Sequence, residues 1–397
     1  MLSAAAAAAT WEPFPAAGQT NQATCGTRGM PLPIFASLMI TYAVVQTIVL
    51  LLAIRFLDPY EREPVSAVAI MALWGAVGAT TISAVGNVAF RDLLPPDIRE
   101  VFGAAIYAPA VEEVAKGLAL VVFLVVSLRA RGRLGIPNFE GVTDGIVYGA
   151  AVGLGFAFTE DILYLLLGAS QGGLEEGFVT YLSRRDFFGV GLLHHAIYSA
   201  AFGVGLGLGT WRTGRIARVA LPVAGLLVAV TLHALNNGLV QAVLVFRYGL
   251  DRAGEYLALG ASVPGGAAMQ DSARAAVSFV RTFDFVLIGL FAAAVYLWLR
   301  YQRRVIAEEL EEEAASGLIS RTEWRLMPMY WKRSLWYLQL IRTGQWERWR
   351  LLKRIHNELV DLALLKRRVK RGRADAASVD RARRLIEKLK AQKIVFL

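Results

Sequence analysis

The chain has 397 residues and a formal net charge of +10; 56% of its residues are hydrophobic and 19% are charged. A positive mean hydropathy of +0.46 with so few charges excludes an ordinary cytosolic globule and a disordered chain. Cys25 is the only cysteine, which also excludes an intrachain disulfide scaffold. The composition predicts a polytopic membrane protein.

In chain order, residues 1–33 come first and are expected to form a flexible leader, because they lack a basic segment followed by an apolar one. Residues 34–299 are the predicted transmembrane core. A hydrocarbon layer about 30 Å thick needs about 20 apolar helical residues, and about seven runs of that length occur. Their uniform apolarity predicts an all-α bundle and not a barrel. The runs lie near 34–57, 65–90, 106–128, 145–168, 187–211, 219–246 and 278–299.

Residues 300–397 form a basic tail, with 24 Lys and Arg against 12 Asp and Glu, whereas residues 1–299 hold 18 against 20. Five of the nine tryptophans lie in this tail among basic residues, a pattern that suits the bilayer surface and anionic headgroups. Apolar residues at helical spacing between 352 and 369, and again at 385–389, predict a helical hairpin with a turn at 372–378. No nucleic-acid-binding module is visible, so no nucleic-acid partner is expected.

Basic residues in the short connections predict the orientation of the chain. They follow the third span (Arg129, Arg131, Arg133), the fifth span (Arg212, Arg215, Arg218) and the seventh. We therefore expect the N-terminus outside and the tail in the cytoplasm.

Polar residues are concentrated in four consecutive predicted spans, whereas the first two are nearly free of them and the seventh has Asp284 as its main exception. An ionisable group at bilayer depth is costly and is retained mainly where it is paired or functional, so the four helices are expected to share one polar interior. Glycines on the fourth and fifth spans, such as Gly149 and Gly203, allow close helix packing. The polar residues are Glu112, Glu113 and Lys116; Glu160 and Asp161; His194 and His195; and His233, Asn236 and Asn237.

These ordered motifs resemble the PrsW family of intramembrane proteases, distant relatives of the CAAX-processing and bacteriocin-processing membrane proteases. The similarity covers residues 100–240: EExxK at 112–116, FxxxE at 156–160, His195-Ala196 before a glycine-rich helix, and HxxxN at 233–237. Asp161 stands where many members have Asn, and His194 is an additional departure.

The resemblance implies an intramembrane endopeptidase of the bacterial plasma membrane that cuts membrane-anchored proteins, for example an anti-sigma factor. It also implies that the glutamates and histidines are catalytic. Family members have been described both as glutamic-type and as metal-dependent enzymes.

The residues themselves favour water as the nucleophile, because Cys25 lies outside the spans and no GxSxG motif is present. A partly desolvated glutamate can act as a general base, which suits Glu112 with Glu113 in support. His195 is expected to orient the water or move its proton, and His233 and Asn237 to donate to the oxyanion. The candidate catalytic residues are Glu112, Glu113, Glu160, His195, His233 and Asn237, with Lys116 supporting them.

Two alternatives stay open. The favoured glutamic mechanism needs no cofactor, but His195, His233 and Glu113 could instead hold zinc, although no HExxH motif is present. In a different class, buried Glu, Lys and His also build the relays of proton-coupled transporters and channels. Phe156 and Ser199 are expected to pack, and His194 to be a non-catalytic neighbour, since adjacent helical residues point about 100° apart.

Overall fold

The computed structural model describes residues 32–60, 63–93, 95–129, 139, 141–185, 192–210, 212, 214–259, 262–372 and 374–392. All regular structure in these residues is helical, with no strand among them, which agrees with the predicted all-α class. Most of the predicted leader, residues 1–31 with Cys25, lies outside the described residues, as do Arg131 and Arg133.

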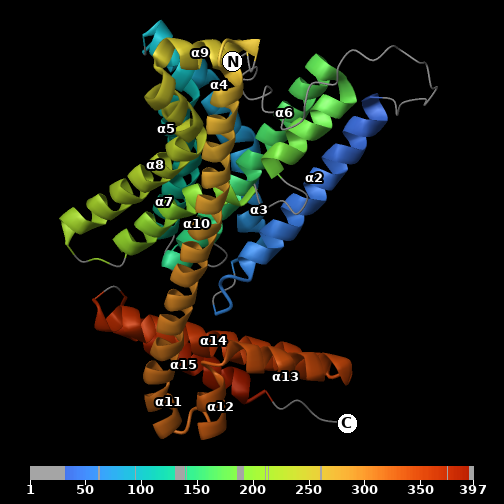
Figure 1. Ribbon diagram of the computed structural model, residues 1–397. Helices are drawn as coiled ribbons and strands as arrows, with labels where there is room; N and C mark the ends of the chain where they lie inside the picture. Colours follow the sequence, from blue (N-terminus) through green and yellow to red (C-terminus); the bar gives the residue numbers. More distant parts are fainter. Residues whose placement is uncertain are drawn as a thin grey trace. The chain divides into compact units, whose positions relative to one another are not determined.

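The chain forms two compact units. The first, called here the membrane unit, comprises Met1–Arg55 and Glu63–Phe291; the second, the tail unit, comprises Phe56–Arg62 and Ala292–Leu397. Helix α10 (Gly266–Glu309) contributes to both (Figure 1). The membrane unit further contains α2 (Leu32–Arg55), α3 (Val65–Leu73), the π-helix η1 (Trp74–Ala79), α4 (Thr80–Phe90), the 3₁₀ turn η2 (Arg91–Leu93), α5 (Pro96–Arg129), α6 (Val142–Arg185), α7 (Leu192–Thr210), α8 (Arg215–Tyr248) and α9 (Leu250–Leu259). The tail unit contains α11 (Glu311–Ala315), α12 (Arg321–Leu326), α13 (Tyr330–Arg342), α14 (Trp346–Lys370) and α15 (Ala376–Lys390).

Five segments of the described chain are long and apolar enough to cross a bilayer, which makes this an integral membrane protein. The predicted runs near 106–128 and 187–211 coincide with α5 and α7, which are helices but are not among the five. Both carry the polar motif residues of the expected interior, and these lower their hydropathy. The five are Pro33–Arg55, Val65–Phe90, Val142–Ser170, Arg215–Tyr248 and Gly266–Ala315.

Helix α6 changes direction at Gly173, where φ is 82° and ψ is −168°. Only glycine adopts such a positive φ without strain, so this residue ends the regular membrane-crossing part of α6.

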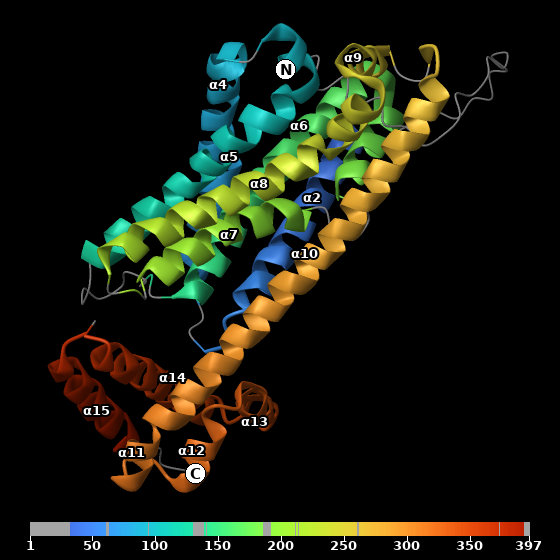
Figure 2. The ribbon, with the colours of Figure 1, turned by 60° about the vertical axis from the view of Figure 1, so that its left-hand side comes forward.

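The helices that carry the motifs pack closely. Helix α7 packs against both α6 and α8, and Figures 1 and 2 show α5, α7 and α8 side by side. A Cβ atom at Gly149 of α6 would lie 2.5 Å from the Ser199 carbonyl oxygen of α7, and one at Gly153 would overlap the His195 carbonyl. The glycines therefore bring the backbones of α6 and α7 into contact beside His195, as the sequence indicated.

The π-helix η1 forms hydrogen bonds with α5 and α6 in the same region. Trp74 Nε1 donates to the Ala115 carbonyl of α5 at 3.1 Å, and Thr159 Oγ1 of α6 donates to the Ala76 carbonyl at 2.7 Å. Single π-turns inside helices are often found at functional sites. Here the π-turn packs beside two of the predicted motifs.

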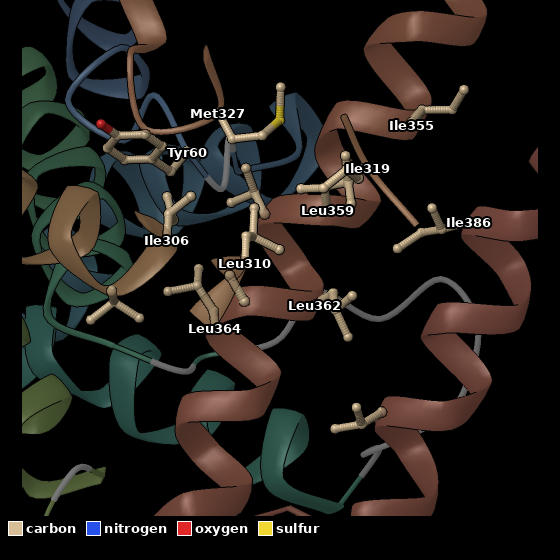
Figure 3. Packing of buried hydrophobic residues seen from close by; sticks show 14 of the residues in the cluster. Tyr60, Ile306, Leu310, Ile319, Met327, Ile355, Leu359, Leu362, Leu364 and Ile386 are labelled. Atoms are coloured by element: carbon tan, nitrogen blue, oxygen red, sulfur yellow. The ribbon is translucent and has the colours of Figure 1, made fainter. Parts of the chain in front are cut away.

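The tail unit has a hydrophobic core of its own. Its centre is formed by α14, whose Ile355, Leu359 and Leu362 face buried residues of α10 and α15 (Figure 3). Tyr60, from the short segment between α2 and α3, belongs to the same core and donates its hydroxyl to the Pro328 carbonyl at 2.8 Å. The tail is thus a helical unit, and its α14 and α15 contain the two helices that the sequence predicted.

Two buried glutamates of the tail unit, Glu309 and Glu313, are paired with basic side chains. The Glu313 carboxylate, 1% exposed, accepts from Lys366 Nζ at 2.8 Å and from Arg383 at 2.7 Å. Glu309, also 1% exposed, accepts from Arg367 Nε at 2.8 Å and lies 2.7 Å from Lys370 Nζ. Part of the basic charge of the tail therefore neutralises buried acids of α10 and α11.

We expect Gly149→Ala to destabilise the membrane unit by about 1–3 kcal/mol, because the new methyl group has no room against the α7 backbone. Denaturant unfolding in detergent measures this. The matched control is Gly289→Ala on α10, where a Cβ atom would meet nothing within 4 Å. That change should leave stability unchanged or raise it by up to about 1 kcal/mol. Equal stability of the two variants would contradict the close α6–α7 contact.

Lys366→Met should destabilise the tail unit by about 3 kcal/mol, the lower end for breaking a buried ion pair, because Arg383 still reaches Glu313. Tryptophan fluorescence during chemical unfolding reports this change. The exposed Lys388 provides the control, and Lys388→Met should shift the unfolding free energy by less than about 0.5 kcal/mol. A comparable loss in both variants would refute a specific role for the buried pair.

Candidate active site

The structure brings the four predicted motifs together from four helices. Helix α5 supplies Glu112, Glu113 and Lys116, α6 supplies Glu160, α7 supplies His195, and α8 supplies His233. The cluster forms because α7 lies against both α6 and α8, while α5 packs against α8.

Glu113 is the most completely bound residue of the cluster. Its side chain is 1% exposed; Oε1 accepts from Lys116 Nζ at 2.8 Å and lies 2.9 Å from His233 Nδ1, and Oε2 accepts from Ser199 Oγ at 3.2 Å. A carboxylate with these partners is ionised and acts only as an acceptor, so His233 carries its proton on Nδ1. In the neutral imidazole the lone pair of His233 is then on Nε2.

Glu112 has the opposite environment. It is buried, and its Oε2 lies 3.7 Å from both Lys116 Nζ and His233 Nε2, too far for hydrogen bonds. Within the described residues this buried oxygen has no hydrogen-bond partner. Such an atom requires a proton, a water molecule or a cation as a partner.

His195 is held at both ring nitrogens. Nδ1 lies 3.1 Å from Lys116 Nζ, and Nε2 lies 3.0 Å from Glu160 Oε2. Because an ammonium group can only donate, Nδ1 accepts, so Nε2 carries the ring proton beside the Glu160 carboxylate. Each of the two histidines is therefore oriented by a carboxylate, His233 by Glu113 and His195 by Glu160.

Three side chains of this cluster can hold a metal ion. Ligand atoms of Glu112, His195 and His233 all lie within 4.8 Å of one another. Two imidazoles and a carboxylate are a donor set of catalytic zinc, and carboxylates on the remaining imidazole nitrogens are the usual outer partners of such ligands. The carboxylate in this group is Glu112, whereas the sequence favoured Glu113, whose oxygens are already engaged by Lys116, His233 and Ser199.

Lys116 lies among the same donors. Its fully buried ammonium contacts Glu113 and His195, and it lies 3.8 Å from the centre of the Phe156 ring. The chain thus supplies one cation of its own to the cluster.

Aromatic residues form the walls of the site; Phe156 was expected only to pack, and Tyr198 was not predicted. The Phe156 ring lies 5.4 Å from that of His195, and the Tyr198 ring stacks on His233 at 5.2 Å and 23°. Ser199, expected only to pack, donates to Glu113. Tyr198 and Ser199 lie three and four residues after His195, on the same helix face, and this spacing could have predicted that they belong to the site.

The remaining predicted residues lie beside the cluster. His194 Nε2 lies 3.0 Å from the buried Asp284 carboxylate of α10, so this histidine joins α7 to α10. Asn237, half-buried on α8, accepts at Oδ1 from Asn236 Nδ2 at 3.2 Å. The oxyanion role of Asn237 stays a prediction. Asp161 is buried next to Glu160.

Comparison with known families agrees with this geometry. Residues 63–259 match the model of the PrsW family intramembrane metalloproteases. The chain belongs to the PrsW family of intramembrane proteases. The match contains all four motifs and extends beyond the predicted 100–240 on both sides. No curated protein and no solved structure matches the chain.

For this PrsW family member we expect the purified protein to retain about one zinc ion per chain, and Glu112→Gln, His195→Ala and His233→Ala each to lose most of it. Elemental analysis after dialysis measures the stoichiometry. The control is His194→Ala, one residue from a proposed ligand, which should keep its metal. Equal zinc content in the His194 and His195 variants would argue against the proposed set.

Proposed function

We propose that the protein is a zinc-dependent intramembrane endopeptidase that hydrolyses membrane-anchored proteins. The observation that carries this proposal is the convergence of Glu112, His195 and His233, with each histidine oriented through its other ring nitrogen by a carboxylate. Structural ion pairs need no such arrangement, whereas metal ligands are commonly held in this way. The name of the family gives independent support.

In this mechanism Glu112, His195 and His233 would hold the metal ion, and Lys116 Nζ, which lies 3.1 Å from His195 Nδ1, would have to leave that nitrogen. When bound, zinc supplies a Lewis acid that polarises the scissile carbonyl and lowers the pKa of water. Glu113 keeps the His233 lone pair on Nε2, facing Glu112. Glu160 has the most exposed of the three carboxylate side chains, at 19% against 9% for Glu112 and 1% for Glu113. We therefore assign Glu160 to proton exchange with water.

A glutamic mechanism is the second candidate, and the position of Lys116 favours it. Its ammonium already contacts Glu113 and His195 Nδ1, so the charge of the cluster is compensated without a cofactor. Glu112 would then be the general base, supported by Glu113. His195 would orient the water, and His233 with Asn237 would donate to the oxyanion.

The proposed topology has seven spans. Helices α5 and α7 pack against spans that are apolar enough to cross the bilayer, and their polar residues face the cluster. We propose that both cross as well, with the N-terminus outside and the tail in the cytoplasm, in a bacterial plasma membrane. A site at bilayer depth suits substrates with one membrane anchor, such as anti-sigma factors or other single-pass regulators.

Proteolysis of a panel of single-pass membrane proteins by the reconstituted enzyme tests the function. Glu112→Gln, His195→Ala and His233→Ala should each lower the cleavage rate at least about a hundredfold, because each removes a ligand of the metal. A strong chelator should abolish wild-type cleavage, and added zinc should restore it. Gel analysis of the cleavage products over time gives the rates.

Glu255→Gln is the matched control, an exposed glutamate of α9 inside the family domain, and its rate should stay within about twofold of wild type. Cleavage that ignores the chelator but is lost in the Glu112 variant would replace the metal mechanism with the glutamic one. If wild type cleaves nothing and the variants change only proton flux in vesicles, the protein is a transporter and the protease proposal fails.

A further inference from the structure

A second chemically distinctive place lies in the tail unit. A cavity of about 920 Å³ opens between the end of α10, helix α12 and the segment that carries Tyr60. Four arginines line it, together with Tyr60, Tyr296 and Trp324. The four are Arg300, Arg303 and Arg304 of α10 and Arg325 of α12.

The four arginines are exposed, and none of them has an ion-pair partner among the described residues. This differs from Lys366, Arg367 and Arg383 of the same unit, which are bound to glutamates. Unpaired guanidinium groups around one cavity repel each other unless an anion lies between them. The cavity therefore has the electrostatics of an anion site.

The walls of the cavity are held in place before any ligand arrives. The buried Tyr60 donates to the Pro328 carbonyl, and its ring packs edge-on against that of Tyr330 at 6.4 Å. Trp324 Nε1 donates to the Ala307 carbonyl of α10 at 2.8 Å. A preformed wall lowers the ordering cost of binding.

The position along α10 indicates where the anion comes from. Tyr296, Arg300, Arg303 and Ala307 follow one another at spacings of three or four residues, so they share one helix face, and the apolar run of α10 ends at residue 299. Aromatic and basic residues at the end of a membrane span lie at the level of the lipid headgroups. Guanidinium groups bind phosphate oxygens through paired hydrogen bonds.

We propose that this cavity binds a phosphate group, supplied by the headgroup of an anionic phospholipid. Arg300 and Arg303 would bind the phosphate oxygens. A soluble phosphate ester has the same chemistry, so the experiment separates the two sources. The inference goes beyond peptide hydrolysis and does not depend on it.

Binding to the full-length protein in detergent is measured by native mass spectrometry and by tryptophan fluorescence, since Trp324 lies in the wall. The probes are short-chain phosphatidylglycerol, short-chain phosphatidylcholine, glycerol 3-phosphate and inorganic phosphate. We expect phosphatidylglycerol to bind at least about tenfold more tightly than phosphatidylcholine, and the double variant Arg300→Gln/Arg303→Gln to lose at least about tenfold of that affinity.

The control is Arg342→Gln/Arg350→Gln, which removes the same charge from two exposed arginines outside the cavity, and it should change affinity less than about twofold. Arg303→Lys keeps the charge but loses the paired geometry, so a severalfold loss there supports the site even if the double variant fails to fold. Glycerol 3-phosphate binding as tightly as the lipid would assign the cavity to a soluble phosphate. Equal losses in the cavity and control variants, or no loss in either, would overturn the proposal.

Discussion

The Glu113 carboxylate is buried among the helices of a membrane bundle, and such a charge persists only where opposite charge and hydrogen-bond donors surround it. Lys116 provides the charge from the next turn of α5, but the donors His233 and Ser199 come from α8 and α7. Satisfying one carboxylate therefore holds three helices in register. The same contacts orient His233. The interactions that stabilise the buried Glu113 carboxylate therefore also position a residue of the candidate site.

Close packing makes this arrangement attainable. Glycines of α6 bring its backbone onto α7 next to His195, and this allows Glu160 of α6 to reach the His195 ring. Larger residues there would separate the helices and break the short contacts on which the proton positions depend. The π-turn η1 forms further hydrogen bonds with α5 and α6. The glycines of α6 and the π-turn, which take no part in the proposed chemistry, thus set the distances between the site residues.

The basic residues of the tail unit include some that pair with buried glutamates and four that line the cavity. Buried glutamates of α10 and α11 pair with Lys366, Arg367 and Arg383 of α14 and α15. These three basic side chains stabilise the unit. The four arginines around the Tyr60 cavity have no such partners among the described residues. A net positive charge by itself does not distinguish these two groups. The distinction bears directly on which basic residues are available to a membrane surface.

Sequence alone determined the membrane class, the helical fold and the family, because apolar run length and the four motifs are local patterns. It also indicated that residues such as Glu112 and His195 share one interior. Only the tertiary structure decided that Glu112, and not Glu113, lies with the two histidines as a candidate ligand, since neighbouring helical residues differ by about 100° in direction and the rotation of α5 depends on its packing. The sequence also did not predict the cavity lined by Tyr60 and Arg325, because its walls come from segments that are far apart in the sequence.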